Sequence, residues 1–208
     1  MRTKVLGRPK SDPTRDLRRE LLAASRQLLD EGGPAALSMR EVARRANCTH
    51  QAPYHHFENR EAIIATLVAQ GFDALATCLQ EANDLGISGG VRAALLASGA
   101  AYLNFSLAQP GVFRIMFRPD MCDASKFPAV QESGARANHE LDRLCAIVYG
   151  EQAHYAMATI LWAHVHGLAC LLLDGPLAMQ LQTESQRIEY LQCVGEKFAD
   201  MALSKAAR

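Results

Sequence analysis

Nine consecutive residues, Thr49 to Phe57, carry an unusual concentration of hydrogen-bonding groups. Three of them are histidines, and Gln51 and Tyr54 add an amide and a phenol where a structural helix would carry leucines. Glutamine can bind adenine through two hydrogen bonds, alanine can touch a thymine methyl group, and hydroxyl or imidazole groups can reach phosphates. The composition of this segment therefore favours contact with double-stranded DNA.

Two short helices joined by a three-residue turn are predicted to position the segment. Ser38 and Glu41 have the spacing of a capping box, in which the serine hydroxyl accepts from the backbone N–H of Glu41 and the glutamate carboxylate reaches back to the N–H of Ser38. Asn47 tolerates the left-handed conformation that ends the first helix, and Thr49 can cap a second helix over about 50–57. This arrangement is a helix-turn-helix, although paired short helices also occur in proteins that never touch DNA.

The helix-turn-helix geometry assigns a role to each polar residue. The N-terminal residues of the second helix face base edges in the major groove, and later residues lie beside phosphates. Arg60 would begin the next helix, where free backbone N–H groups attract phosphate. Arg40 lies near the start of the first helix and is the better base-reading candidate there, whereas Arg45 is expected to be a surface charge. The predicted base contacts are His50, Gln51 and Ala52, the predicted phosphate contacts are Tyr54, His55, His56 and Arg60, and Ser38, Arg40, Arg44 and Thr49 complete the predicted DNA-binding set.

The charge of the chain is divided unevenly along its length. The 208 residues include 22 Lys and Arg against 22 Asp and Glu, so the formal net charge is zero. The first 60 residues nevertheless hold 12 basic and 7 acidic side chains, which leaves +5 there and −5 in the remaining 148. A basic end on an acidic body suits a protein that brings one end to a polyanion, although a solvated basic helix surface would give the same count.

Composition excludes several classes of protein. Hydrophobic residues make up 49 % of the chain, which is typical of a folded globular protein and excludes intrinsic disorder. The six cysteines are dispersed without a C-x-x-C pair, so we expect reduced thiols and neither a disulfide framework nor a zinc site. No apolar run approaches the roughly 18 residues that cross a bilayer, and the N-terminus lacks the apolar region of a signal peptide. We therefore expect a cytoplasmic protein with no membrane partner.

The remainder of the chain is predicted to be helical. No segment alternates with period two for long enough to form a sheet, so the fold class is all-α. Glycine and proline divide the sequence into helix-length pieces, and the stretch 84–90 is expected to interrupt the first of them. The expected helices span about 60–83, 91–108, 110–118, 128–149, 152–174 and 184–204.

Four short strings around the helix-turn-helix are specific enough to suggest a family. They are Leu37–Ala43, Asn47–Thr49, Tyr54–Phe57 and Asn59–Glu61. Through them, residues 15–62 resemble the DNA-binding domain of the tetracycline-repressor (TetR) family of bacterial transcription regulators. That family usually has Gly at the position of Asn47 and Lys at that of Arg60, and both changes keep the physical role. Pro53 replaces an aliphatic residue, but it falls in the first turn of the helix, where a lost N–H costs little.

The last 140 residues resemble the same family more weakly. The strings are 110–117 and 162–168, the second of which looks like a subgroup in which Trp-x-x-x-His-Gly recurs. The resemblance implies that the middle helices enclose a ligand cavity and that the last two long helices, about 152–174 and 184–204, form a four-helix dimer interface. Their apolar stripes agree, because they hold more apolar surface than a monomer leaves exposed. The expected domains are a basic flexible tail at 1–14, a helix-turn-helix domain at 15–62, and a helical ligand-binding and dimerisation domain at 63–208.

Seven side chains are candidates to line the ligand cavity. They are Tyr102, Phe105, Phe113, Met116, Phe117, Trp162 and His166. Each has the spacing of a helical core residue, so packing is the competing interpretation. His164 and His166 cannot bind one metal ion together, because side chains two residues apart on a helix point about 200° away from each other. We expect no metal and no other cofactor.

The chain lacks three common enzyme motifs. They are the P-loop, G-x-G-x-x-G and H-E-x-x-H. The sequence therefore predicts a ligand-responsive DNA-binding transcription regulator without catalytic residues, acting as a homodimeric repressor that a small molecule releases from an inverted-repeat operator. The alternatives are a small α-helical enzyme, whose turnover would survive mutation of residues 49–57, and a helical interaction module, which would not bind a duplex at low salt.

Overall fold

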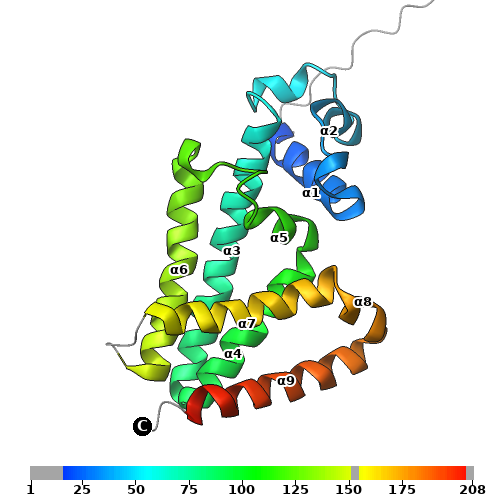
Figure 1. Cartoon of the computed structure of the whole chain (residues 1–208). Coiled ribbons are helices and arrows are strands. Elements are labelled where there is room, and N and C mark those ends of the chain that lie inside the picture. Colours follow the sequence, from blue (N-terminus) through cyan, green and yellow to red (C-terminus); the bar gives the residue numbers. More distant parts are fainter. Residues whose placement is uncertain (1–15, 151–154, 205–208) are drawn as a thin grey trace, which may run out of the picture.

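The computed structural model describes residues 16–150 and 155–204, and no strand occurs within these ranges. The all-α prediction is therefore confirmed for the described part of the chain (Figure 1). The predicted basic tail at 1–14 lies outside the described residues. The elements are α1 (Leu17–Ala36), α2 (Met39–Arg45), the 3-10 turn η1 (Ala52–His55), α3 (Arg60–Gly89), α4 (Val91–Ala108), α5 (Pro110–Met116), the 3-10 turn η2 (Ala124–Lys126), α6 (Pro128–Tyr149), α7 (Tyr155–Leu173), α8 (Pro176–Gln180) and α9 (Glu184–Ser204).

A small helical unit occupies one end of the molecule (Figure 1). Asp16 caps α1 by accepting a hydrogen bond from the backbone N–H of Arg19, and α1 is interrupted at Gly33, whose φ of 64° breaks the helical path. Helix α1, α2 and the start of α3 close around a fully buried centre that includes Leu29, Val42 and Ile63. This packing fixes the orientation of η1 between α2 and α3.

Helix α3 is longer than the sequence predicted. It continues through 84–89 to Gly90, where a φ of 85° ends it, so the predicted interruption is wrong. Packing explains the difference, because α4 returns so closely along α3 that a Cβ on Gly86 would lie 2.3 Å from the Cα of Ala94. Gly86 lowers the local helix propensity, but its lack of a side chain allows α4 to pack closely against α3.

The larger unit is built along α3. Helices α4 and α6 pack against it, α7 crosses α4, and α9 returns past α4 after the short α8 (Figure 1). Most predicted helix positions are confirmed to within two residues, whereas α8 and η2 were not predicted. Residues 152–154 of the predicted 152–174 helix lie outside the described ranges.

Three helices are long and apolar enough to cross a membrane by length and composition alone. They are α3, α4 and α7, so the expectation that no apolar stretch reaches this length is wrong. In the most apolar 18-residue window of α3, half is buried within the chain, whereas only 28 % of the corresponding window of α7 is buried. Helix α7 therefore presents apolar surface that a single chain leaves uncovered, including Ile160 and Leu171.

Helix α5 connects the larger unit to α1. The backbone N–H of Gly111 donates to the Asp30 carboxylate at 2.8 Å, and the two helices touch so closely that an added Cβ would lie 2.7 Å from the carbonyl carbon of Leu29. Such a distance to main-chain atoms leaves no room for a side chain. The α1–α5 contact therefore requires glycine at this position.

We expect Gly111→Ala to lower the free energy of unfolding by about 1–3 kcal/mol, because α5 must move away from α1. Chemical denaturation measures the change. Gly134→Ala on α6 is the matched control, since an added Cβ there meets open space and the substitution should be neutral or stabilising. Equal stability of the two variants would contradict the close α1–α5 contact.

Candidate nucleic-acid interface and ligand cavity

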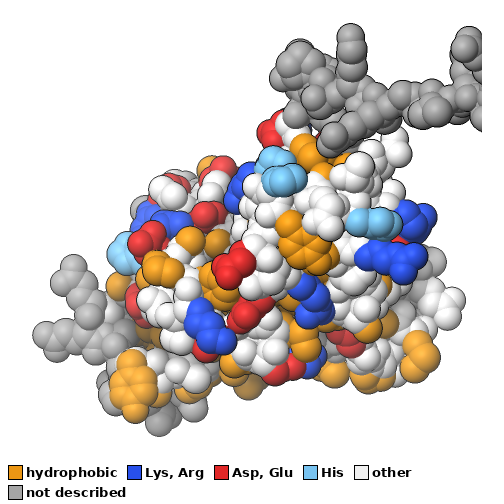
Figure 2. Space-filling model, turned by 90° about the horizontal axis from the view of Figure 1, so that it is seen from above, with side chains coloured by type: hydrophobic (Ala, Val, Ile, Leu, Met, Phe, Trp, Pro, Cys, Tyr) orange, Lys and Arg blue, Asp and Glu red, His pale blue; other side chains and the backbone are white. Residues whose placement is uncertain are grey.

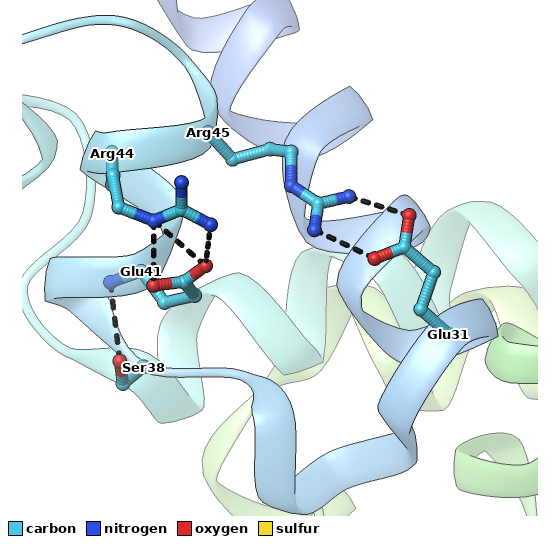
Figure 3. Close-up of polar contacts among 5 residues, drawn as sticks. All are labelled: Glu31, Ser38, Glu41, Arg44 and Arg45. Carbon is cyan, nitrogen blue, oxygen red and sulfur yellow. Dashed lines mark hydrogen bonds and ion pairs between the residues drawn. The ribbon is translucent and has the colours of Figure 1, made fainter.

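The start of α2 confirms one half of the predicted capping box. The Ser38 hydroxyl accepts a hydrogen bond from the backbone N–H of Glu41 at 3.1 Å (Figure 3). The other half is wrong, because the Glu41 carboxylate accepts instead from the Arg44 Nε at 3.0 Å. The ion pair holds the Arg44 guanidinium against its own helix. Ser38 is thus engaged as a helix cap.

The segment after the turn is not the predicted α-helix over 50–57. Asn47 has the predicted left-handed backbone, with a φ of 51°, but the following residues form only the 3-10 turn η1. Pro53 explains this, because it has no N–H to bond to the residue four positions earlier and its ring crowds that carbonyl. Thr49 does not cap the turn with its side chain; its carbonyl accepts from the N–H of Ala52.

The tight turn nevertheless presents the predicted polar side chains outward. Pro53 and Phe57 are buried and fasten η1 to the core. Tyr54 is 53 % exposed, and histidine and basic side chains are visible on this end of the molecule (Figure 2). The other exposed members of the predicted set are Thr49, His50, Gln51, His55 and His56, with Ala52 half-buried. The structure thus confirms that these side chains are exposed, whereas the predicted α-helix over 50–57 is wrong.

The arginines of this unit divide into exposed and engaged groups. Arg40 is exposed, and Arg45 behaves as the predicted surface charge by forming two hydrogen bonds to Glu31 of α1, at 2.6 and 2.7 Å (Figure 3). Arg60 is different. Its guanidinium donates to the carbonyl oxygens of Leu37 at 2.7 Å and Pro34 at 2.6 Å.

These bonds fasten the start of α3 to the connection between α1 and α2. The predicted phosphate contact of Arg60 therefore gives way to a structural role, since the residue follows N-cap Asn59 but turns its charge inward. Arg60 and Leu37 are 23 positions apart in the sequence, so no local sequence pattern reveals the contact between them.

Arg18 is a basic neighbour of η1 that the sequence analysis missed. Its guanidinium carbon lies 5.1 Å from the ring centroid of Phe57, within the range of a cation–π contact, and the side chain is exposed. It belongs to the first turn of α1, and the excess of basic residues near the N-terminus was the only available signal. The contact places a further positive charge beside the exposed turn.

A second candidate site lies in the larger unit. A cavity of about 650 Å³ opens between α3, α4, α6, α7 and α9. Of the seven predicted lining residues, Tyr102, Phe117 and Trp162 line it. The other four, Phe105, Phe113, Met116 and His166, are not on its wall.

Packing accounts for these four corrections. Phe105, Phe113 and Met116 are buried in the core, where Phe113 makes edge-to-face contacts with Tyr102 and Phe117 at centroid distances of 5.8 and 5.5 Å. His166 lies behind the wall and contacts it through Tyr102. Helical periodicity identified inward-facing side chains, but it could not distinguish the layer that meets the cavity from the layer behind it.

Three polar side chains form a hydrogen-bonded cluster at the wall. The Tyr102 hydroxyl lies 2.8 Å from the Nδ1 of His166, and the Trp162 Nε1–H donates to the same hydroxyl oxygen at 3.3 Å. Burial raises the pKa of Tyr102 and lowers the pKa of His166, so both groups are held neutral. Which of the tyrosine hydroxyl and the imidazole donates depends on the imidazole tautomer. The four-residue spacing of Trp162 and His166 puts both on one side of α7.

Six polar residues on the cavity wall were not predicted as lining residues: Ser98, Asn104, Asn138, His164, Gln192 and Glu196. The His164 ring stacks on Phe198 of α9 at a centroid distance of 3.6 Å, and Ser98 of α4 is only 4 % exposed. Ser98 precedes Tyr102 by four residues, so both belong to one face of α4. That spacing was the available signal for the serine.

Comparisons with known proteins place both units in one family. Residues 21–67 match the N-terminal domain of bacterial regulatory proteins of the tetR family, and residues 95–191 match a tetracyclin repressor-like C-terminal domain. The two matches together take in more than half of the chain. The chain belongs to the tetR family of regulatory proteins. It is accordingly a DNA-binding transcription regulator, and the N-terminal match includes the whole of η1.

Solved structures show the same architecture. A protein of unknown function from Rhodococcus sp. RHA1 is 26 % identical, with a TM-score of 0.71 over 93 % of this chain and 98 % of that one. PfmR from Thermus thermophilus, a TetR family transcriptional regulator, is 16 % identical with a TM-score of 0.64 over 88 % and 97 %. FadR from Bacillus subtilis, solved with stearoyl-CoA, is 13 % identical with a TM-score of 0.64 over 89 % and 97 %. No curated protein sequence matches this chain.

The stability of this tetR-family regulator is expected to fall as the pH is lowered below about 6.5, the ordinary pKa of histidine. Burial lowers the pKa of His164 and of His166 in the folded chain. Below about pH 6.5 the unfolded chain therefore binds protons that the folded chain does not bind. The free energy of unfolding consequently falls as the pH is lowered through this value. Urea denaturation between pH 7.5 and 5.5 measures the effect. His164→Phe keeps a ring against Phe198 and should lose less stability over this interval.

His139→Gln, at an exposed position of α6, is the control for that experiment and should decline as steeply as the wild type. A decline in His164→Phe as steep as in the wild type would contradict the assignment of this pH dependence to the buried imidazole.

The structure also describes the pairing of the cysteines and the grouping of potential metal ligands. All six cysteines lie in the described ranges, and no disulfide joins any of them. No cluster of three or more His, Cys, Asp or Glu suited to a metal ion occurs in the part of the chain that the structure describes.

Proposed function

We propose that this regulator is a homodimeric repressor that binds inverted-repeat operator DNA and is released by a small-molecule effector. The observation that carries the proposal is the exposed turn η1, on which Gln51, Tyr54 and three histidines project from a backbone anchored by buried Pro53 and Phe57. Polar side chains on a rigid protrusion suit insertion into a major groove. His50, Gln51, Ala52 and Arg40 are assigned to base edges.

The other proposed operator contacts keep the predicted set with two changes. Tyr54, His55 and His56 are assigned to phosphates, and Ser38, Arg44 and Thr49 flank the DNA. Arg60 is assigned instead to holding the domain together, and Arg18 is added as a phosphate contact. We assign the DNA-binding domain to residues 15–62, the ligand-binding and dimerisation domain to 63–208, and the protein to the bacterial cytoplasm.

Dimerisation is proposed to use α7 and α9. Helix α7 is apolar but little buried, and in α9 the only buried side chains among the described residues are Ala199 and Ala202. Pairing these helices with their two-fold copies would cover apolar side chains on both, including Ile160, Leu171 and Met201. A two-fold dimer presents two η1 turns, which suits an inverted repeat.

Effector release is proposed to pass through α5. Phe117 follows the last turn of α5 and lines the cavity, whereas Gly111 at its other end is bound to Asp30 of α1. A ligand that displaces Phe117 would therefore move the DNA-binding unit. Coupling of this kind is reciprocal, so operator DNA would weaken ligand binding. We also keep the assignment to a Trp-x-x-x-His-Gly subgroup, because Trp162 and His166 share the Tyr102 hydroxyl.

The proposal is tested by fluorescence anisotropy on a duplex of mixed sequence at increasing salt. We expect binding in the micromolar range at low salt, with affinity that falls steeply as phosphate-bound counterions compete. Arg18→Gln should reduce the slope of log affinity against log salt by about one per subunit. Absence of duplex binding at low salt would overturn the proposal in favour of a helical interaction module.

A further inference from the structure

The described part of the DNA-binding unit carries no net charge. Seven arginines and no lysine lie between Asp16 and Ala62, and seven Asp and Glu side chains balance them. Non-specific affinity for DNA comes almost entirely from cations that neutralise phosphates. The helices that position η1 therefore supply little of the charge on which DNA binding depends.

Contacts within the chain reduce the available positive charge further. Arg44 and Arg45 each pair with a glutamate. Arg60 donates to two backbone carbonyls, and half-buried Arg26 donates to the side-chain amide of Gln70. The arginines of this unit that stay exposed without an ion pair to a described residue are Arg18, Arg19 and Arg40.

The surface around η1 also carries an opposing charge. Glu58 is exposed and follows Phe57 directly, so its carboxylate lies immediately after the turn. A carboxylate in this place repels phosphate. The described residues therefore leave the turn with hydrogen-bonding groups for bases but with few cations for the DNA backbone.

The basic excess at this end of the chain precedes the described residues. Residues 1–15 hold five basic side chains and one acidic side chain, and the five are Arg2, Lys4, Arg8, Lys10 and Arg15. The segment joins the structure at Asp16, the N-cap of α1. Two positions later, the Arg18 guanidinium lies 5.1 Å from the ring centroid of Phe57, a residue that fastens η1 to the core. Residues 1–15 are therefore attached beside the turn that we assign to the major groove.

The residues around Arg8 suit contact with a minor groove. Arginine is a side chain that proteins insert into the narrow minor groove of A·T-rich DNA, where the negative potential is strongest. Gly7 has no side chain to keep the backbone away from the groove, and Pro9 has no N–H that requires a partner there.

The chain length between Arg8 and Asp16 is sufficient for this contact. The two residues are eight positions apart, which can span at most about 26–29 Å. Along a duplex, the minor groove lies about half a helical turn, or about 17 Å, from the centre of the adjacent major groove. Arg8 can therefore reach the minor groove next to the one that η1 would occupy.

We propose that residues 1–15 are a second DNA-contacting segment, in which Arg8 enters the minor groove beside each half-site and the other basic residues bind phosphates. The inference rests on the proposed placement of η1 in a major groove. It assigns most of the phosphate-binding charge to a segment outside the helix-turn-helix. It also adds a preference for A·T pairs at positions that η1 does not touch.

The phosphate contacts are tested with a variant in which Arg2, Lys4, Arg8 and Lys10 are all replaced by Gln. Fluorescence anisotropy on a duplex of mixed sequence should give a slope of log affinity against log salt that is smaller by about three to four per subunit than for the wild type. Thermal unfolding verifies that the variant keeps the wild-type fold. Arg136→Gln removes an exposed cation from α6 in the larger unit and, as the control, should leave the slope unchanged.

The minor-groove contact is tested with three duplexes built only of A·T, inosine·C or G·C pairs. Inosine lacks the 2-amino group of guanine, so its pair with C has the minor-groove groups of A·T and the acceptors of guanine in the major groove. We expect the wild type to bind the A·T and inosine·C duplexes about threefold to tenfold more tightly than the G·C duplex. Arg8→Gln should lose this difference. Arg2→Gln, the matched control, removes the same charge outside the Gly7–Pro9 string and should retain it.

The outcomes separate the inference from the function on which it rests. An unchanged salt slope in the fourfold variant would overturn the role of residues 1–15 and leave η1 as the DNA-binding element. Equal affinity of the wild type for the three duplexes, or an equal loss of preference in Arg2→Gln and Arg8→Gln, would overturn the assignment of Arg8 to the minor groove. If the wild type binds none of the duplexes at low salt, the proposed operator binding is overturned as well.

Discussion

The double variant Ile160→Glu/Leu171→Glu is expected to be monomeric and to bind operator DNA about 10² to 10⁴ times more weakly than the wild-type chain. The two side chains are 52 % and 43 % exposed, and their separation of 11 residues puts them on one face of α7. In a two-fold interface each substitution occurs twice, so four carboxylates would be buried without partners. A monomer then loses the gain in affinity from engaging two half-sites together.

Sedimentation velocity gives the oligomeric state of this variant, and anisotropy gives its operator affinity. Leu85→Glu is the matched control, because Leu85 is 75 % exposed but belongs to α3 and to neither helix of the proposed interface. The control should remain dimeric and bind as the wild type does. A double variant that is still dimeric would contradict the assignment of the interface to α7.

Gln51→Ala is expected to lose sequence discrimination of about 1–3 kcal/mol at each half-site, or about 5-fold to 150-fold, because the amide is assigned to an adenine edge. In a dimer the loss occurs at both half-sites. Competition between the operator and duplexes with one altered base pair per half-site measures it. Binding to unrelated duplexes should change little, since phosphate contacts supply most of that affinity.

Gln131→Ala, at an exposed position of α6 outside the DNA-binding unit, is the control for this substitution and should leave operator preference intact. If Gln51→Ala prefers the operator as strongly as the wild type does, the base contact must be reassigned to another exposed residue, with Arg40 as the first candidate.

Local signals predicted most of the fold. Pro110 and Pro128 each begin a helix where the sequence placed one, and Ser38 caps α2 through the predicted hydrogen bond. These features depend on a few neighbouring residues, so they can be derived without the tertiary structure. Gly86 shows the limit of this reasoning, because its low helix propensity is outweighed by the close packing of α4 on α3.

The sites were predicted less completely than the fold. The exposure of the polar residues around η1 was predicted correctly, because their types are out of place in a core. Arg60 and Phe113 were misassigned for a shared reason: the partner of each lies far away in sequence or on another helix. His164 was excluded as part of a metal site, but its place on the cavity wall depends on the approach of α9. Contacts between distant elements decide such roles, and no local pattern encodes them.

Selection of bound duplexes from a random-sequence library tests the central claim, that this chain reads operator DNA as a two-fold dimer. The wild-type chain is predicted to enrich an inverted repeat whose half-site centres are separated by about one helical turn of DNA, or a multiple of it. Gln51→Ala should enrich the same spacing with relaxed preference at one position of each half-site. Recovery of no common sequence, or of a single half-site without its inverted copy, would contradict the account.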